Sequence, residues 1–554
     1  MRRLDSAPMH IEMRKLFKLM RAALALVCAT SAACAAPPSL DGIEGAYADF
    51  NDASGAVSLI ESGLRDSFEG KTRGEWAGLQ QQARDAVQKG LKTLAGQGLS
   101  PTDRRAIDVM RSSMVEADDS GSLAPGGTCA DAQRKDIGYA ALRTALYACF
   151  GVLSNSLNFE GTKVTRVGAF DLLTRMDEPE RRKQLFLQFM PLWQSINGKN
   201  ERDSPYRRVI VMAAEHARAD GTAIDAAAKT VGASAAEVEK WLVQILQAWR
   251  KTDDGEPMEP WDYRYRGGAT ERELGDTIAR AAMQPINERF YRDLGARLAE
   301  WNVIYDLDPR PGKAPLAYTD YVKRGRMRDG QWEPTLVRVS GNYAHGGLGL
   351  INELVHENGH VVHMMALHTR PAFMDLGDPL FYEAFADVPS WSTYEPAWQK
   401  RYLGRSSRED SSLRALFSNV MLDVAWALFE LRMLREPKQD PNVVWTEITS
   451  HYLNVIPHPE LSWWLVRVQL VDSPGYMVNY GLGAVVTADI RQRIASQLGR
   501  FDTGDERWFS WLSQNLLSSG QTRETAKLLR AFLGRPVSPQ ALLAEIGRMQ
   551  KETH

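Results

Sequence analysis

The sequence predicts a mainly α-helical protein made of more than one lobe. Apolar residues recur at three- and four-residue spacing, the pattern of an amphipathic helix, in three clear segments: 76–94, 235–249 and 412–434. The second segment also has a helix start signal, because Ser234 lies three residues before Glu237 as in a capping box. Alternation of apolar and polar residues is scarce, and its best example is one short strand over 335–340. A chain of 554 residues is too long for one ordinary core, so two or three lobes are expected.

The overall composition is that of a folded globular protein. Hydrophobic residues make up 44% of the chain and charged residues 25%, which excludes a wholly disordered chain or a coiled-coil rod. The formal net charge is −2, so the charge balance indicates neither a nucleic-acid partner nor binding to an anionic membrane surface. The chain has 10 histidines, and half of them fall between positions 345 and 368. This segment is therefore the first place to look for a metal site.

Residues 1–35 are typical of a secretory signal peptide. A basic start is followed by a short apolar stretch from Ala22 and by the small residues Ala33-Cys34-Ala35. Met13 is the expected true start, because the residues before it add acidic side chains to a region that should be basic. The apolar stretch is shorter than the ~20 residues of a membrane span, and we expect no transmembrane segment later in the chain. The predicted location is periplasmic or secreted, with lipid attachment at Cys34 as an alternative.

Two cysteines, Cys129 and Cys149, remain once the predicted signal peptide is removed. An even pair in an exported protein favours a disulfide. Two buried thiols are the alternative, and in either case two cysteines are too few for a cysteine-rich metal site.

A segment rich in Asp, Gly and Pro, 251–260, is predicted to link two regions of the chain. We expect a helical N-terminal lobe over 36–255, whose sequence carries no chemical motif. The catalytic region is then expected over 256–554.

The candidate metal ligands and the candidate general base lie in one segment, which contains His356, Glu357 and His360 in a His-Glu-x-x-His pattern. Residues four apart share one face of a helix, so both imidazoles can bind a single metal ion. Zinc suits nitrogen and carboxylate ligands in tetrahedral geometry with one open position, and we expect one Zn²⁺ per chain. Glu357 is then placed to act as the general base that takes a proton from the attacking water.

A third ligand is expected from a second helix, in which Glu383 and Asp387 also share a face. The natural division gives Glu383 to the metal and places Asp387 behind it, where it accepts the N–H of a ligand imidazole. His363 is a competing ligand because it lies three residues after His360 on the same face, but core packing or support of a ligand is favoured for it.

The oxyanion that forms during hydrolysis needs a hydrogen-bond donor besides the metal. Tyr476 and Tyr480 are the best candidates for this role. His451 and His458 remain open as alternatives.

These residues resemble the gluzincin zinc peptidases, and more closely the family of thimet oligopeptidase, oligopeptidase A and bacterial dipeptidyl carboxypeptidase. The His-Glu-x-Gly-His form with Gly359, followed by His363, is similar to that family's signature. Further similarities follow in the expected order up to the C-terminus: Pro260-Trp261-Asp262 with Tyr265, the stretch 475–489, and the stretch 532–536 with Ala541.

The third-ligand segment departs from the family pattern. The family usually has its ligand in a Glu-Ala-Pro-Ser-like run, and aligning that run with 387–390 makes Asp387 the ligand. The spacing of Glu383 and Asp387 instead resembles the angiotensin-converting enzyme family, where the glutamate binds zinc and the aspartate supports it. We follow the second alignment because it gives both carboxylates a role.

The resemblance implies a two-lobed helical shell around a deep channel that admits short, extended peptides. In such a fold the strand over 335–340 can be the edge strand on which a peptide lies by backbone pairing. Asn342 and His345, which follow it, are then candidate substrate-binding residues.

The sequence thus predicts an exported zinc peptidase that hydrolyses short oligopeptides. Its cleavage mode stays open, since trimming from the carboxyl end requires a basic group for the terminal carboxylate and Arg467 is one of many candidates. The alternatives are a non-catalytic peptide-binding or scaffold protein that keeps the fold, and a purely structural zinc site. An intact Glu357 argues against the first, and a carboxylate ligand without a fourth side chain argues against the second.

Overall fold

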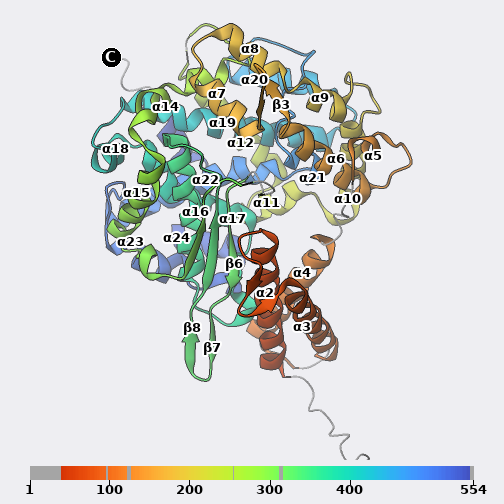
Figure 1. Cartoon of the computed structure of the whole chain (residues 1–554), viewed down its shortest axis with the longest axis vertical. Helices are drawn as coiled ribbons and strands as arrows, with labels where there is room; N and C mark the ends of the chain where they lie inside the picture. Colours follow the sequence, from red (N-terminus) through yellow and green to blue (C-terminus); the bar gives the residue numbers. More distant parts are fainter. Residues whose placement is uncertain are drawn as a thin grey trace, which may run out of the picture.

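Helices dominate the computed structural model (Figure 1), which describes residues 39–94, 98–120, 127–253, 255–310, 313 and 316–549. The mainly α-helical fold class is confirmed. Each predicted helix is present, in α3 (Arg73–Thr93), α12 (Ala235–Arg250) and α19 (Glu409–Arg435). The predicted capping box is also formed, because the Glu237 carboxylate accepts the Ser234 N–H while the Ser234 hydroxyl accepts the Glu237 N–H. The predicted signal peptide lies outside the described residues.

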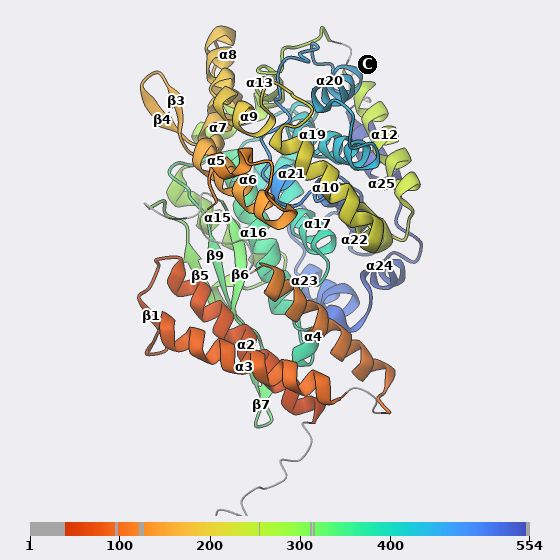
Figure 2. The same ribbon diagram turned by 90° about the vertical axis from the view of Figure 1, so that its right-hand side faces the viewer.

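The first three described helices form a separate small layer, which Figure 2 shows at one end of the molecule. They are α2 (Leu40–Glu61), α3 and α4 (Pro101–Ser120), with the short hairpin β1 (Ser67–Phe68) and β2 (Lys71–Thr72). Their apolar faces make two small cores of their own. Val322 from the central sheet completes one core, and Ala372 and Phe373 complete the other. A Cβ on Gly55 would lie only 2.4 Å from the Val322 carbonyl oxygen, so glycine allows α2 to contact the sheet backbone.

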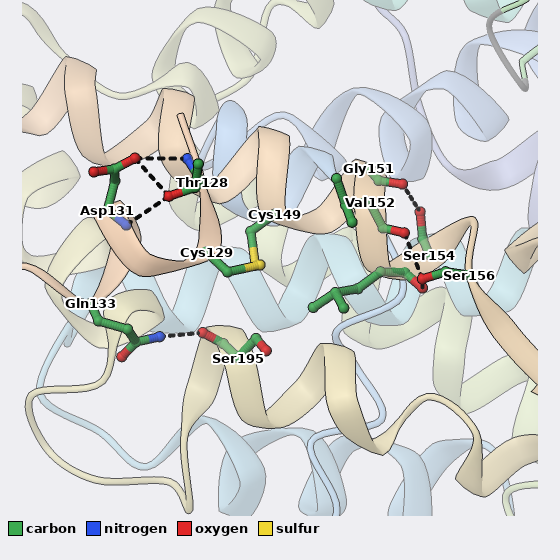
Figure 3. Close-up of a disulfide and its surroundings, with 11 residues drawn as sticks. Thr128, Cys129, Asp131, Gln133, Cys149, Gly151, Val152, Ser154, Ser156 and Ser195 are labelled. Atoms are coloured by element: carbon green, nitrogen blue, oxygen red, sulfur yellow. Dashed lines mark hydrogen bonds between the residues drawn. A yellow bond between two sulfur atoms is a disulfide. The ribbon is translucent and has the colours of Figure 1, made fainter. Parts of the chain in front are cut away.

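A second group of helices precedes the sheet. They are α5 (Cys129–Gln133), α6 (Tyr139–Ser154), α7 (Arg166–Arg175), α8 (Pro179–Leu187), α9 (Met190–Asn197), α10 (Pro205–Asp220), α11 (Ala223–Val231), α12, α13 (Tyr263–Gly267), α14 (Ala269–Leu274), η1 (Gly275–Thr277), α15 (Arg280–Asp293) and η2 (Leu298–Glu300), with the hairpin β3 (Leu157–Phe159) and β4 (Thr162–Val164). A disulfide between Cys129 and Cys149 joins α5 to α6 (Figure 3). Thr128 caps α5 by accepting the Asp131 N–H.

The remaining helices follow the sheet and carry most of the hydrophobic core. They are α16 (Leu348–Ala366), η3 (Pro371–Phe373), α17 (Pro379–Ser390), η4 (Trp391–Tyr394), α18 (Pro396–Leu403), α19, α20 (Pro441–Tyr452), α21 (Gln469–Asp472), α22 (Met477–Leu498), α23 (Arg507–Leu512), η5 (Ser513–Leu517), η6 (Gly520–Thr522), α24 (Thr525–Leu533) and α25 (Gln540–Arg548). One contiguous core runs from Ala132 to Met549 and includes Trp249 and Trp261, on either side of the predicted linker.

The central sheet corrects one expectation. Its strand order is β5 (Val303–Asp306), β9 (Leu336–Ser340), β6 (Tyr318–Lys323), with β9 parallel to β5 and antiparallel to β6. The strand predicted over 335–340 is therefore the central strand and cannot offer an edge to a peptide. The edge strand beside α16 is β6, and the hairpin β7 (Arg326–Arg328) and β8 (Gln331–Glu333) follows it.

The helix α19 bears on the expectation that no transmembrane segment follows the predicted signal peptide, and that expectation stays a prediction. The helix is long and apolar enough, by length and composition, to cross a membrane, and it is the one such helix in the described part of the chain. Within the protein, however, 78% of its apolar window is buried. This burial is typical of the core helix of a folded domain.

Candidate metal centre and the cavity around it

The helix α16 carries His356, Glu357 and His360 through the middle of the molecule (Figure 1). Its first turn is held from outside the helix, because the Glu271 carboxylate accepts the N–H groups of Leu348 and Gly349 at 3.0 and 2.8 Å. An anion at a helix N-terminus satisfies unpaired N–H groups and complements the helix dipole.

The helix α17 carries Glu383 and Asp387 and packs directly on α16. Asp378 caps its N-terminus by accepting the Leu380 N–H at 3.0 Å, and Pro379 occupies the first helical position. Gly359 sets how close the two helices come, since a Cβ at this position would lie 2.7 Å from the Ala386 Cα. The glycine of the His-Glu-x-Gly-His pattern thus has a packing role.

Three donor groups converge between the two helices: the imidazoles of His356 and His360 and the carboxylate of Glu383. The Nε2 atoms of His356 and His360 lie 3.4 and 3.9 Å from Glu383 Oε2. Ligands about 2.0–2.1 Å from a tetrahedral zinc ion are about 3.3 Å apart. The chemistry and the spacing of these donors therefore fit one small dication that prefers nitrogen and carboxylate ligands.

Asp387 lies behind the donor set rather than within it. Its Oδ1 is 2.8 Å from His356 Nδ1, and the Ser390 hydroxyl donates to the same oxygen at 3.2 Å. Burial lowers the pKa of His356, but Asp387 and Glu383 outweigh burial and raise the pKa well above its ordinary value. Because Nδ1–H is donated to Asp387, Nε2 is the nitrogen of the neutral ring that is left to bind a metal ion. The predicted division of roles requires this geometry of the two carboxylates, and the division itself stays a prediction.

His363 is directed into the core instead of the donor set. It is 1% exposed, and its ring packs edge-on against Phe381 and Phe385. Burial lowers the pKa of His363 to about 3, so the ring is neutral. Core packing, the favoured interpretation of the sequence, is the role that this geometry supports.

Glu357 faces the cavity beside the donors and contacts the edge strand. The Thr319 hydroxyl of β6 donates to Glu357 Oε2 at 2.7 Å. Burial raises the pKa of Glu357 to about 7, against the opposing effects of His356 and Thr319. A carboxyl group that titrates near neutral pH is suited to take up and release a proton during a reaction.

Thr319→Val should shift the acidic limb of the kcat/KM profile for peptide hydrolysis upward by about one pH unit. The hydroxyl stabilises the ionised form of Glu357, which is the form that can act as a base, so its loss raises the pKa. With a cation bound nearby, the wild-type limb should lie at or below about pH 7. Thr319→Ser keeps the hydroxyl and serves as the control. A limb that is unmoved, or that moves downward, would contradict the assignment of Thr319.

A cavity of about 1570 Å³ opens over these residues. Tyr480 and Tyr382 line it, and Tyr476 lies beside both, with its ring 5.8 Å from that of Tyr480. Burial raises the pKa of Tyr476 to about 12 and that of Tyr480 further, so both phenols keep their protons as donors. The segment before α22 is fixed by Glu430, whose buried carboxylate accepts the N–H groups of Gly475 and Met477.

The other predicted site residues are divided between the cavity and the surface. Asn342 lines the cavity, and its amide donates to the Leu316 carbonyl at 3.4 Å. His345 is absent from the described lining; its side chain is about half exposed, with Nε2 3.6 Å from Asp171. His451 and His458 are also outside the lining that the structure describes. His458 instead bridges Glu259 and Glu460.

Two residues of the site carry no signal that sequence reasoning found. Tyr382 packs edge-on to His360 with ring centres 5.7 Å apart, yet it differs from other helical tyrosines only by preceding Glu383. Thr319 lies in a strand that has no recognisable pattern, so its contact with Glu357 follows only from the fold.

Part of the sequence is similar to a known protein family. Residues 298–548 match the profile of peptidase family M3. No match to the sequence was found among curated proteins.

Three solved structures share the fold over nearly the whole chain. The M32 carboxypeptidase from Deinococcus radiodurans R1 has a TM-score of 0.56 and 16% identity over 92% of this chain and 98% of its own. PZ peptidase A has a TM-score of 0.57 and 15% identity over 92% of this chain and 96% of its own. Metallocarboxypeptidase 1 from Trypanosoma cruzi has a TM-score of 0.54 and 14% identity over 93% of this chain and 99% of its own.

The family match covers β5, β6 and β9 together with α16, α17 and α22, which carry the donor set, the base and the tyrosines. It therefore includes both helices of the His-His-Glu donor set, while Glu271 of α14, which holds the start of α16, lies outside it. The chain is a metallopeptidase whose region 298–548 is similar to peptidase family M3.

Proposed function

We propose that the protein is an exported zinc peptidase that hydrolyses short oligopeptides. The observation that carries this proposal is the juxtaposition of a His-His-Glu donor set with a buried carboxyl group, Glu357, at the surface of one large cavity. A donor set without such a base would suit a binding protein equally well.

Zinc is the metal that fits these donors best, because two imidazoles and one carboxylate leave a position open in tetrahedral geometry. His356, His360 and Glu383 would hold it. When bound, zinc supplies Lewis acidity to a carbonyl oxygen and lowers the pKa of water toward neutrality.

Residues of the chain itself transfer the proton, stabilise the oxyanion and orient a ligand. Glu357 removes a proton from the attacking water and returns it to the amine that leaves when the C–N bond breaks. The Tyr480 hydroxyl, with Tyr382 and Tyr476 beside it, donates a hydrogen bond to the carbonyl oxygen as negative charge develops there. Asp387 keeps the His356 ring in one tautomer throughout.

The shape of the site supports short, extended substrates. The edge strand β6 lines the cavity from Tyr318 to Tyr321, so a peptide can pair with it through backbone hydrogen bonds. The small helical layer at 40–120 contributes Tyr47, Phe50 and Arg84 to the lining, which encloses the cavity on that side. The structural neighbours include two carboxypeptidases and a peptidase, in keeping with peptide substrates.

Two features support export to an oxidising compartment. The Cys129–Cys149 disulfide is of a kind that persists outside the cytosol. The sequence over 1–35, with its Ala33-Cys34-Ala35 end, is typical of a signal peptide that directs export from the cytosol.

The decisive test compares the full chain with its Glu357→Gln variant on a mixed library of quenched peptides, with bound metal counted in both. The wild type should carry close to one zinc per chain and cleave peptides. The variant should keep its zinc and lose about 10²- to 10⁴-fold in kcat/KM, the usual contribution of a general base.

The outcomes separate the proposal from its rivals. Equal, low activity in both proteins with zinc retained would favour a peptide-binding protein that keeps the fold. Loss of zinc from Glu357→Gln would mean that this residue belongs to the donor set, and absence of zinc from both would contradict the metal assignment.

A further inference from the structure

One wall of the cavity is strongly basic. Arg166, the first residue of α7, and Arg467, just before α21, both line the cavity. Arg264 of α13 lies behind them, close enough for the three charges to repel one another. Neither α7 nor α13 has a role in the mechanism proposed above, so these arginines need another explanation.

The basic wall has more positive than negative charge. Arg467 is paired with Asp423, and both side chains are partly buried. In the described part of the chain, Arg166 has no ion pair: its guanidinium donates a long hydrogen bond of 3.4 Å to the Val466 carbonyl and lies 5.5 Å from the Phe170 ring. Arg264 lies 3.9 Å from the same ring.

Partial burial makes this concentration of positive charge unfavourable. Burial and the charge of Arg467 together lower the pKa of Arg166 to about 10, partly offset by attraction to Glu353. Arg166 is therefore still a cation at neutral pH, but one that lacks a close anionic partner. A cation that is partly shielded from water is stabilised when an anion with matching hydrogen-bond geometry comes into contact with it.

The basic wall lies next to the metal centre. The Arg467 guanidinium is 5.8 Å from the ring of Tyr480, and that phenol is in turn close enough to Glu383 to be affected by its charge. Arg166 is in electrostatic contact with both Tyr480 and Glu353, which lies one helical turn before His356. An anion bound by the two arginines would thus be separated from the reacting groups by a single side chain, that of Tyr480.

We propose that Arg166 and Arg467 bind the C-terminal carboxylate of the peptide, so that the protein removes short fragments from carboxyl ends. This inference rests on the proposed peptidase function and names its substrate class. Guanidinium groups match carboxylates with paired hydrogen bonds, and every unblocked peptide carries one such group at its C-terminus. The reaction remains hydrolysis, with water adding hydroxide to the acyl carbon and a proton to the amine.

The test uses matched quenched peptides that end in either a free acid or an amide. Wild-type protein should cleave the acid with a kcat/KM at least about 30-fold higher than the amide, the usual effect of losing one partner of a buried charge pair. Arg166→Gln should remove most of this preference, and Arg166→Lys should restore part of it. Arg84→Gln, which changes an arginine on another wall of the same cavity, is the matched control and should keep the preference.

Two further experiments complete the test. One distinguishes a terminal from an internal carboxylate, and the other distinguishes failure of the carboxylate anchor from failure of the peptidase function. An amide peptide with an internal glutamate that is cleaved as well as the free acid would overturn the terminal assignment. Binding of both peptides to Glu357→Gln, measured by calorimetry, tests the anchor without hydrolysis. An acid preference in binding with no cleavage by wild type would support the anchor and refute the peptidase function, whereas cleavage with no acid preference would refute the anchor alone.

Discussion

Glu383→Ala should leave the protein without stoichiometric metal and reduce peptide hydrolysis to background. Glu383 Oε2 is the only oxygen in the His-His-Glu donor set of the described residues, 3.4 Å from His356 Nε2. Without it, two imidazoles would hold the ion alone, and two ligands are too few for a tetrahedral site. Zinc content after dialysis, together with kcat/KM, measures both effects.

Asp387→Ala gives the matched comparison, because it removes a carboxylate from the same face of the same helix. Asp387 contacts His356 Nδ1 at 2.8 Å and orients the ring, so its loss should weaken zinc affinity only about 10- to 100-fold. Excess zinc should then restore activity to Asp387→Ala and not to Glu383→Ala. The reverse result would establish the alternative alignment, in which Asp387 is the ligand.

The local parts of this site could be predicted because they depend on helical spacing. His356 and His360, like Glu383 and Asp387, are four residues apart, and that spacing alone places each pair on one helix face. The start of α12 followed from Ser234 in the same way. In each case the information lies within one or two turns of a single helix.

The position of the central strand could not be predicted in this way. The alternation around Arg338 predicted a strand with Val337 and Val339 on one face and Arg338 and Ser340 on the other, and this strand was the expected edge. Arg338 is in fact 1% exposed, and its guanidinium donates to Asp320 and to the Ser58 hydroxyl of α2. A buried ion pair under a distant helix gives the same sequence pattern as exposure to solvent. Tertiary contacts therefore decide which strand forms the edge.

The residues that line the cavity could not be predicted from the sequence either. Thr319, Tyr382 and Arg166 come from a strand and two helices far apart in the chain, and only the packing of these elements brings them to one cavity. The N-terminal lobe carries no motif because it contributes isolated side chains such as Arg84 rather than a pattern.

Gly359→Ala should destabilise the protein by about 1–3 kcal/mol and weaken zinc binding. The added Cβ would lie 2.7 Å from the Ala386 Cα and 2.9 Å from the Ala386 carbonyl oxygen. Both atoms belong to the backbone of α17, so no change of rotamer can relieve the contact and the two helices must separate. Because His360 is the next residue on α16 and Glu383 lies one turn before Ala386, their separation lengthens the donor distances directly.

Gly349→Ala is the control, since it makes the same substitution in the first turn of the same helix. The nearest atom to its Cβ is Glu271 Oε2 at 3.9 Å, an ordinary contact, so this variant should be neutral or more stable by about 0.4–1 kcal/mol. Denaturant unfolding and zinc titration of both variants distinguish a packing requirement at Gly359 from a general preference for flexible residues in α16. If Gly359→Ala keeps wild-type stability and zinc affinity, close contact of α16 with α17 is not what positions the ligands.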